Sequence, residues 1–403
     1  MLSRLTRGYA FLPREVVIVA AKRTPIGSFM GSLSAIPAPK LGAHAIKAAL
    51  NQAKLKPNQV SELIFGNVLG AGVGQSPARQ AAIFAGLPNE VVCTGVNKVC
   101  SSGMKAITFA AQGLALGHSD VVVAGGMENM SLAPFMLPSY RTGQLMGDGK
   151  VIDSIVNDGL LCPFNNFAMG ACAERTNVKY EITREHQDTY CIKSYERSSA
   201  AWKRGFFNAE VEKMEITTKK GTVVVEEDEE YKKVNFEKIP TLKPVFEKSG
   251  SITPANASKI NDGACALILM TRDKAREMGV KPIARILSFA DNENEPIHFA
   301  VAPKEAMLKA IDRAGIGRYN VGLYEVNEAF SLVPIVSMKL IAIDHKKINV
   351  NGGAVSLGHP LGMSGARIVG SLIYALRENN QRYGVAGICN GGGGGTAIVI
   401  EVI

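Results

Sequence analysis

Long apolar runs are missing from this 403-residue chain. Glycine and charged residues interrupt every apolar segment before the roughly 18 residues that a membrane-spanning helix needs, so we expect no membrane span. The seven cysteines show neither a CxxC pair nor a Cys/His ligand spacing, which indicates no zinc site and no disulfide framework. With 46% hydrophobic residues the chain can still bury a large core, and its length predicts two or more domains.

Runs of one charge sign are also missing, although the formal net charge is +9. Basic residues alternate with acids in KKGTVVVEEDEEYKKVNFEK, so we expect a solvated surface and no nucleic-acid partner. A few basic residues that serve a phosphorylated small ligand fit this distribution better. Residues 1–14 contain Arg4, Arg7 and Arg14 but no acid, which is typical of a transit segment and predicts import into the mitochondrial matrix.

The chain contains an internal repeat. When the two halves are aligned, Ser102-Gly103 falls on Ser364-Gly365, and the Val-Ala-Gly triplet at 123–125 falls on the triplet at 385–387. A slightly different offset places residues 50–60 over 311–321, each a helix end followed by a turn and an apolar strand. The period is far longer than the roughly 20 to 50 residues of a solenoid repeat, so it indicates two related domains.

Strands and helices alternate within each half, which predicts an α/β fold with a mostly parallel sheet covered on both faces. The closing strand of the first half, at 263–271, follows only after a long insertion. Insertions at strand ends usually cover a binding site. We therefore predict three regions: a first domain at 15–127 and 255–277, an inserted domain at 128–254, and a second domain at 278–403.

Candidate reactive residues fall at the predicted turns. The stretch VNKVCSSGMKA places Cys100 between a strand and a helix, where the helix dipole and free N–H groups favour a thiolate. Asn327, His359 and Cys389 fall at turns of the second half. Any one of them alone could be an ordinary packing cysteine or turn residue. Because ligands bind at the carboxyl ends of α/β strands, we expect the four side chains to share a cleft.

The motifs together resemble the thiolase family, and the similarity runs from about Glu15 to Ile403. They are NKVCSSGMKA, VAGGMENMS, NEAF, NGGAVSLGHPLGMSGAR and CNGGGGG. The resemblance implies a thiolase fold, with two pseudo-repeated βαβαβ domains, mixed sheets covered by helices, and an inserted loop domain that contacts coenzyme A and other subunits of a homotetramer. It implies reversible Claisen condensation of two acetyl-CoA to acetoacetyl-CoA and coenzyme A.

Two alternatives remain open at this point. A broad 3-ketoacyl-CoA thiolase of β-oxidation would differ in pocket length more than in reactive residues. A catalytically silent acyl-CoA-binding relative would have no chemical need for two thiols and an imidazole, so the presence of all three argues against it.

The resemblance also implies catalytic roles. Cys100 corresponds to the nucleophile that becomes acylated, and His359 to the base that takes its proton. Cys389 corresponds to the thiol that removes a proton from the methyl carbon of the incoming acetyl-CoA. Asn327, through a water, and His359 would form one oxyanion site, and the backbone N–H groups of Cys100 and Gly391 the other. No catalytic transition metal is expected.

Ligand contacts are carried over in the same way. Positions that match coenzyme A contacts of mitochondrial thiolases are Tyr195, Lys233, Val234, Asn235, Lys238 and Ser258. Positions that match their potassium ligands are Tyr195, Pro254, Ala255, Ala257 and Val355.

The predicted acyl pocket contains Phe299, Met169 and Ala168. Phe299 matches a phenylalanine that shapes the room for a 2-methyl group, so thiolysis of 2-methylacetoacetyl-CoA is expected as well. Ala168 stands where related thiolases usually have a histidine that lines the pocket, and Ala300 stands where the mitochondrial members have proline. We expect these departures to change affinity or chain-length preference and to leave the chemistry intact.

Overall fold

The computed structural model describes residues 11–218 and 221–403. Most of the predicted transit segment, including Arg4 and Arg7, lies outside the described residues. Among those described, no helix combines the length and the apolar character needed to cross a membrane.

A mixed sheet of ten strands, counted over the described residues, forms the centre of the molecule. The strands follow the order β14-β15-β16-β13-β1-β12-β5-β3-β4, and β2 pairs with β12. Their bounds are β1 Val16–Arg23, β2 Gly27–Ser28, β3 Glu62–Gly66, β4 Val92–Val96, β5 Val121–Asn129, β12 Asn261–Thr271, β13 Ala284–Glu293, β14 Leu323–Val326, β15 Tyr383–Asn390 and β16 Gly394–Val402.

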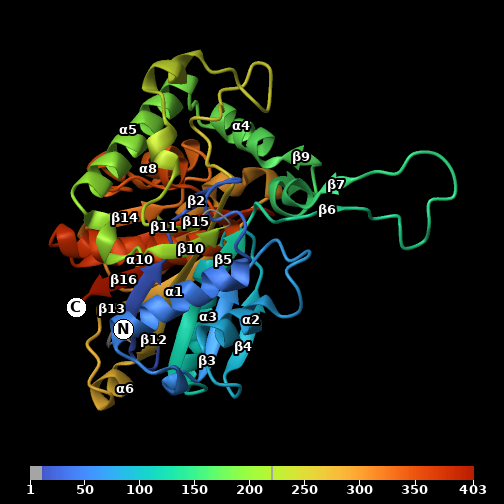
Figure 1. The fold of residues 1–403 in the computed structure, drawn as a ribbon. Coiled ribbons are helices and arrows are strands. Elements are labelled where there is room, and N and C mark those ends of the chain that lie inside the picture. Colours follow the sequence, from blue (N-terminus) through green and yellow to red (C-terminus); the bar gives the residue numbers. More distant parts are fainter. Residues whose placement is uncertain (1–10, 219–220) are drawn as a thin grey trace, which may run out of the picture.

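Helices cover this sheet, as the sequence predicts for an α/β protein (Figure 1). Their bounds are α1 Ala38–Ala53, α2 Pro77–Ala85, α3 Ser102–Leu116, α4 Met169–Lys179, α5 Arg184–Lys203, α6 Arg272–Glu277, α7 Ala302–Arg313, α8 Leu332–Ile341, α9 Ala354–Leu357 and α10 Leu361–Glu378. Short strands complete the inserted region: β6 Phe135–Met136, β7 Ile152–Asp153, β8 Leu161–Cys162, β9 Phe167–Ala168, β10 Met214–Thr218 and β11 Gly221–Val225.

The two halves repeat one strand order. The first half runs β1-β12-β5-β3 and the second runs β13-β16-β15-β14. In both, the first two pairings are antiparallel and the third is parallel. The expectation of a mostly parallel sheet is therefore wrong, because the closing strands β12 and β16 insert antiparallel beside the strands that open each half. The mixed sheet that the family resemblance implies is confirmed.

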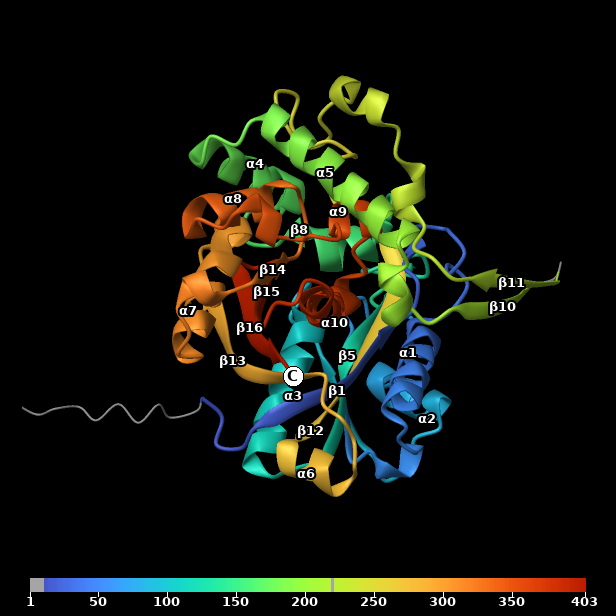
Figure 2. The same ribbon diagram turned by 90° about the vertical axis from the view of Figure 1, so that its left-hand side faces the viewer.

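Helices α3 and α10, which carry the repeated Ser-Gly pairs, pack against each other. Figure 2 shows α10 in the middle of the molecule, and one hydrophobic cluster joins both helices to strands of both halves. A Cβ atom added to Gly103 would lie 2.7 Å from the carbonyl oxygen of Gly362, and one added to Gly365 would lie 2.4 Å from the amide nitrogen of Met104. The backbones of the two helices are thus in direct contact, which only glycine permits.

The inserted region covers one end of the sheet with α4 and α5 (Figure 1). Between β6 and β7 it extends as a long arm away from the body (Figure 1). Large apolar side chains are exposed along this arm: Phe135, Leu137, Tyr140, Leu145, Met146 and Val151. Strand β5 continues to Asn129, so the insertion leaves the sheet two residues later than the predicted boundary at 127.

Two glycine-to-alanine substitutions in α3 test the helix contact. Alanine normally stabilises a helix by about 1 kcal/mol over glycine, and we expect Gly113→Ala to show a gain of this size because only one atom lies within 4 Å of the added Cβ. Gly103→Ala should instead destabilise the protein by about 1 to 3 kcal/mol, because its Cβ overlaps the backbone of α10. Urea unfolding of both variants measures the difference. A gain in stability for Gly103→Ala would contradict the contact.

Candidate active site

Cys100 lies in a strained turn between β4 and α3. Val99, directly before it, has a φ of 47°, which is rare for a β-branched residue. The hydroxyl of Ser102 holds the turn, since it accepts from the Lys98 amide at 2.8 Å and donates to the Val99 carbonyl at 2.6 Å. Backbone strain of this kind concentrates at functional sites, and the sequence contains no signal that predicts it.

Cys389 lies in the last part of β15 rather than in the turn that the sequence predicts, and this end of the strand is tied to the Cys100 turn. The hydroxyl of Ser101 donates to Oδ1 of Asn390 at 2.9 Å, and both residues are buried. The backbone N–H of Gly391 hydrogen-bonds to the Cys100 sulfur and favours its thiolate form. The structure therefore brings Cys100, Cys389 and Gly391 together, as the sequence predicts.

The pKa values of both thiols are raised. Burial raises the pKa of Cys100 to about 12, because the Gly391 N–H offsets only part of the cost of burying the charge. Burial, and then the neighbouring Cys100 charge, raise the pKa of Cys389 well above its ordinary value. Desolvation of the Cys100 sulfur therefore opposes the helix dipole that favours its thiolate, and a base that takes the proton lowers the cost of ionisation.

The geometry at His359 fixes which ring nitrogen can act as that base. Its Nδ1 lies 2.6 Å from the Ser364 hydroxyl, and this hydroxyl donates its hydrogen to the Pro360 carbonyl at 2.8 Å. Nδ1 must then be the donor, which leaves Nε2 with its lone pair. Nε2 is buried and has no partner among the described residues. Burial, and then the charge of Arg367, lower the pKa of His359 to about 3, so the ring is neutral and able to accept a proton.

Asn327 supplies a second unpartnered polar group. Its backbone N–H donates to the Gly387 carbonyl at 2.9 Å, which places it just past the end of β14. The side chain is fully buried, and neither its amide nitrogen nor its oxygen has a partner within the part of the chain that the structure describes. A buried amide without partners is costly, so this one fits a site that binds a polar ligand atom or a water.

The contact between α3 and α10 brings the Cys100 and His359 turns together. Gly103, three residues after Cys100, packs on Gly362, three residues after His359. Glu128, which the sequence analysis did not single out, accepts from the amides of Gly362 at 2.8 Å and Val68 at 3.0 Å. Burial raises the pKa of Glu128 to about 7. The motif VAGGMENMS contains this residue, but only the fold places it at the start of α10.

A cavity of about 560 Å³ opens beside His359. Predicted residues that line it are Lys233, Ser258, Pro254, Ala257, Ala168 and Met169. Apolar residues that the sequence analysis missed also line it, among them Phe29, Val156, Leu160, Phe246 and Phe330. The cavity is thus a largely apolar cleft with an imidazole at one side, which suits an acyl group.

Aromatic packing determines the shape of this cleft. The ring of Phe246 lies against Gly170, where an added Cβ would be only 2.2 Å away. Phe246 meets Phe330 edge to face at a centroid distance of 6.1 Å, and Phe330 meets Phe299 at 6.4 Å. Phe299 is 2% exposed and does not line the cavity. Phe299 therefore lies behind Phe330, and its contact with this ring is the way in which it can act on the pocket.

The residues predicted to contact coenzyme A divide into three groups. Lys233 and Ser258 line the cleft, and the Lys233 ammonium donates to the Ser28 hydroxyl. Val234, Asn235 and Lys238 belong to the neighbouring segment, where the Asn235 side chain accepts from the Lys238 amide at 3.3 Å. Tyr195 is only 3% exposed, in a cluster with Cys191, Ile239, Ala255 and Val355, so its side chain is closed to a ligand.

The predicted potassium positions surround a lysine. Three of them, Ala255, Ala257 and Val355, direct their carbonyl oxygens at the Lys259 ammonium. Pro254 lines the cleft and Tyr195 turns its ring toward the same ammonium. Over the described ranges, no three His, Cys, Asp or Glu side chains are grouped so that they could hold a metal ion.

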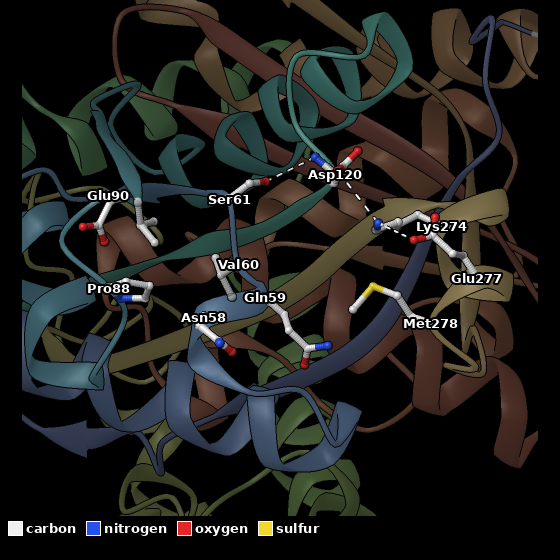
Figure 3. A pocket seen from close by; sticks show the side chains of 11 residues that line it. Asn58, Gln59, Val60, Ser61, Pro88, Glu90, Asp120, Lys274, Glu277 and Met278 are labelled. Carbon is white, nitrogen blue, oxygen red and sulfur yellow. Dashed lines mark hydrogen bonds and ion pairs between the residues drawn. The ribbon is translucent and has the colours of Figure 1, made fainter.

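A second cavity, of about 690 Å³, lies at the other end of the strands of the first half. Figure 3 shows Lys274 in it, 2.8 Å from Glu277 and 3.9 Å from Asp120. Val60 and Asp120 line it, and they precede β3 and β5. It is therefore at the amino ends of the parallel strands, whereas Cys100 follows the carboxyl end of β4. None of the predicted site residues lines this second cavity.

Substitution of His359 should change the pH dependence of stability. Folding lowers the pKa of the His359 imidazole from about 6.5 to about 3, so below pH 6.5 the unfolded chain binds a proton that the native protein does not bind. The free energy of unfolding therefore has its full value above pH 6.5 and decreases as the pH falls. Between pH 7 and pH 5 the native protein should therefore lose about 2 kcal/mol that His359→Asn does not lose. Urea unfolding at both pH values measures this. His345→Asn, at an exposed position, is the control, and equal losses in native protein and His359→Asn would contradict the assignment.

Comparisons with known proteins agree with the geometry. The family model for the thiolase N-terminal domain matches residues 16–273, and the model for the thiolase C-terminal domain matches residues 280–402. The probable acetyl-CoA acetyltransferase of Dictyostelium discoideum is 53% identical over 388 residues, which are 96% of this chain and 94% of that protein. The mitochondrial acetyl-CoA acetyltransferase of Homo sapiens is 52% identical over 399 residues, 98% of this chain and 92% of that protein.

Two solved structures are similar over nearly the whole chain. The Acat5 thiolase from Ascaris suum in complex with coenzyme A has a TM-score of 0.91 and 43% identity, and covers 97% of this chain and 100% of its own. The Bacillus anthracis acetyl-CoA acetyltransferase has a TM-score of 0.95 and 37% identity with the same coverage. From these matches, and from the paired thiols and imidazole that the fold assembles, we conclude that the chain belongs to the thiolase family.

Proposed function

We propose that the protein is an acetyl-CoA C-acetyltransferase. It joins two acetyl-CoA to acetoacetyl-CoA and coenzyme A, and cleaves acetoacetyl-CoA in the reverse direction. The names of the relatives support this activity, and so does the coenzyme A in the complex of the Ascaris suum thiolase. The observation that carries it is the buried Nε2 of His359, which has no partner among the described residues and lies in a turn that the Gly103–Gly362 contact packs against the turn of Cys100.

The first half-reaction acylates Cys100. Its sulfur attacks the thioester carbonyl while its proton passes to Nε2 of His359, so that Cys100 does not have to ionise before it attacks. The backbone N–H groups of Cys100 and Gly391 stabilise the oxyanion. The bond to the coenzyme A sulfur then breaks, and this sulfur takes the proton of Cys389. Coenzyme A leaves as a thiol, Cys389 becomes a thiolate, and His359 is protonated.

The second half-reaction forms the carbon–carbon bond. The Cys389 thiolate removes a proton from the methyl carbon of a second acetyl-CoA, and the enolate oxygen is stabilised by protonated His359 and by Asn327. The enolate carbon attacks the acetyl group, and the bond from this group to Cys100 breaks. His359 returns its proton to the Cys100 sulfur. Both thiols and the imidazole then have the protonation states with which they began.

The finer expectations from the sequence belong to this proposal. Relatives named as mitochondrial and the arginines of residues 1–14 support the mitochondrion, with the matrix as the compartment. Lys233 and Ser258 in the cleft support coenzyme A binding there, and the exposed apolar arm supports tetramer contacts by the inserted region at 128–254. Binding of potassium depends on the carbonyl oxygens of Ala255, Ala257 and Val355, which lie around the Lys259 ammonium.

Two substitutions should separate the half-reactions. With acetyl-CoA, the native protein should gain one acetyl group per chain by intact mass, and Cys100→Ser should gain none. Cys389→Ala should still become acetylated but should not exchange the methyl protons of acetyl-CoA with deuterated water. Cys93→Ala, in the strand that leads to Cys100, is the control and should retain both reactions. Persistent acetylation of Cys100→Ser would contradict the proposal.

Substrate range tests the alternative of a broad 3-ketoacyl-CoA thiolase. We expect thiolysis of acetoacetyl-CoA to exceed that of a long-chain 3-ketoacyl-CoA at least about tenfold in kcat/KM, a difference of about 1.4 kcal/mol. Activity on 2-methylacetoacetyl-CoA should also be present. Equal rates on short and long chains would favour the broad thiolase, for which Ala168 in the cleft wall leaves room.

A further inference from the structure

Lys259 occupies a cradle of oxygen atoms beside the cleft. Its ammonium lies 2.7 Å from the carbonyl oxygen of Ala257, 3.2 Å from that of Val355 and 3.4 Å from that of Ala255. The ring of Tyr195 completes the cradle, with its centroid 5.7 Å from the ammonium nitrogen. Three carbonyls match the three N–H donors of an ammonium, whereas a neutral amine has only two.

The cradle is built for a cation without a carboxylate in contact. No acidic side chain of the described residues forms an ion pair with Lys259, and Glu230 and Glu328 act on it only through their charges, without a hydrogen bond. Carbonyl oxygens and an aromatic face are ligands of weakly hydrated cations. Lys259 thus makes the contacts that the sequence analysis predicted for a potassium ion.

The three carbonyls belong to different parts of the site. Ala255 and Ala257 are in the loop that carries Ser258 along the cleft, while Val355 is in α9, four residues before His359. The same loop is fixed on its other side, where the Ser258 amide donates to the Ala329 carbonyl at 3.0 Å. The Val355 amide donates to Glu328 at 3.0 Å. A cation in the cradle therefore joins the ligand-binding loop to the helix that precedes the base.

We propose that the Lys259 ammonium is a built-in replacement for a bound monovalent cation, and that it positions the Ser258 loop for the acyl-CoA substrate. This rests on the proposed function only in the identity of that substrate. Because a free ion would need the same oxygens and would be repelled by the ammonium, the native protein requires no added potassium. The predicted potassium ligands then serve a side chain of the same chain. Lys259 is a positioning residue, since it does not touch the reacting atoms.

The test removes the ammonium and offers an ion in its place. Thiolysis of acetoacetyl-CoA is measured in potassium, sodium and tetramethylammonium chloride at equal ionic strength. The native protein should have the same KM for coenzyme A in all three salts. In Lys259→Ala the KM should rise about tenfold in sodium or tetramethylammonium chloride with little change in kcat, and potassium chloride should restore most of the affinity. Lys243→Ala, an exposed lysine of the inserted region, is the control and should behave as the native protein.

Thermal unfolding provides a readout that does not need activity. Potassium should raise the Tm of Lys259→Ala more than sodium does. The Tm of the native protein should be the same in both salts. If potassium selectively stabilises Lys259→Ala but the native protein does not catalyse thiolysis, the oxygen cradle is supported and the proposed function is refuted. If Lys259→Ala does not fold, Lys259→Gln, which keeps hydrogen-bond donors without the charge, should show the raised KM.

Two results would overturn the inference. Activation of the native protein by potassium over sodium would mean that a free ion is still needed. An unchanged KM for both Lys259 variants in all salts would mean that the ammonium does not position the loop.

Discussion

Backbone contact between the first turns of α3 and α10 is the constraint on which the site depends. Gly103 and Gly365, the equivalent glycines of the two halves, let the helices approach so closely that a Cβ atom on either would overlap the backbone of the other helix. Gly126 of β5 adds a third close approach, since an added Cβ there would lie 1.9 Å from the Gly362 carbonyl oxygen. With larger side chains the helices would separate, and the turns that carry Cys100 and His359 would move apart.

The polar groups around this contact are held in uncharged or paired states by burial. Nδ1 of His359 is committed to Ser364, so the orientation of the ring is fixed before any ligand arrives. Glu128 holds the start of α10 and the loop at Val68 and Leu69 with one carboxyl group. Because these groups are positioned in advance, little reorganisation is needed when charge develops on a substrate oxygen, which is the physical basis of catalysis in such a site.

Positive charge near the cleft is supplied in two different ways. Lys233 is largely exposed and lies 3.8 Å from Glu230, so its ammonium remains accessible to a phosphorylated ligand. Lys259 directs its ammonium inward to backbone oxygens and acts on the loop that it holds. The number of basic residues does not show which lysine can bind a ligand and which one holds a loop, because this depends on the atoms that surround each ammonium.

The sequence by itself determined the α/β class, the repeat and the positions of the reactive turns. Apolar periodicity identifies strands and helices, and Ser102-Gly103 over Ser364-Gly365 identified the two helices that meet at the centre. The motifs around Cys100, His359 and Cys389 were sufficient for the thiolase family, because local residue order dictates these turns.

What the tertiary structure decided depends on contacts between residues far apart in the chain. The antiparallel insertion of β12 has no local signal, because β12 pairs with β1 and β5 across a long insertion, whereas β16 follows β15 through a glycine turn short enough for a hairpin. The rise in the pKa of Cys100 follows from desolvation, which no motif reports. Phe330 stands between Phe299 and the cleft, Glu128 reaches the start of α10, and Lys259 reaches the Val355 carbonyl, in each case because the fold brings together atoms that are far apart in the sequence.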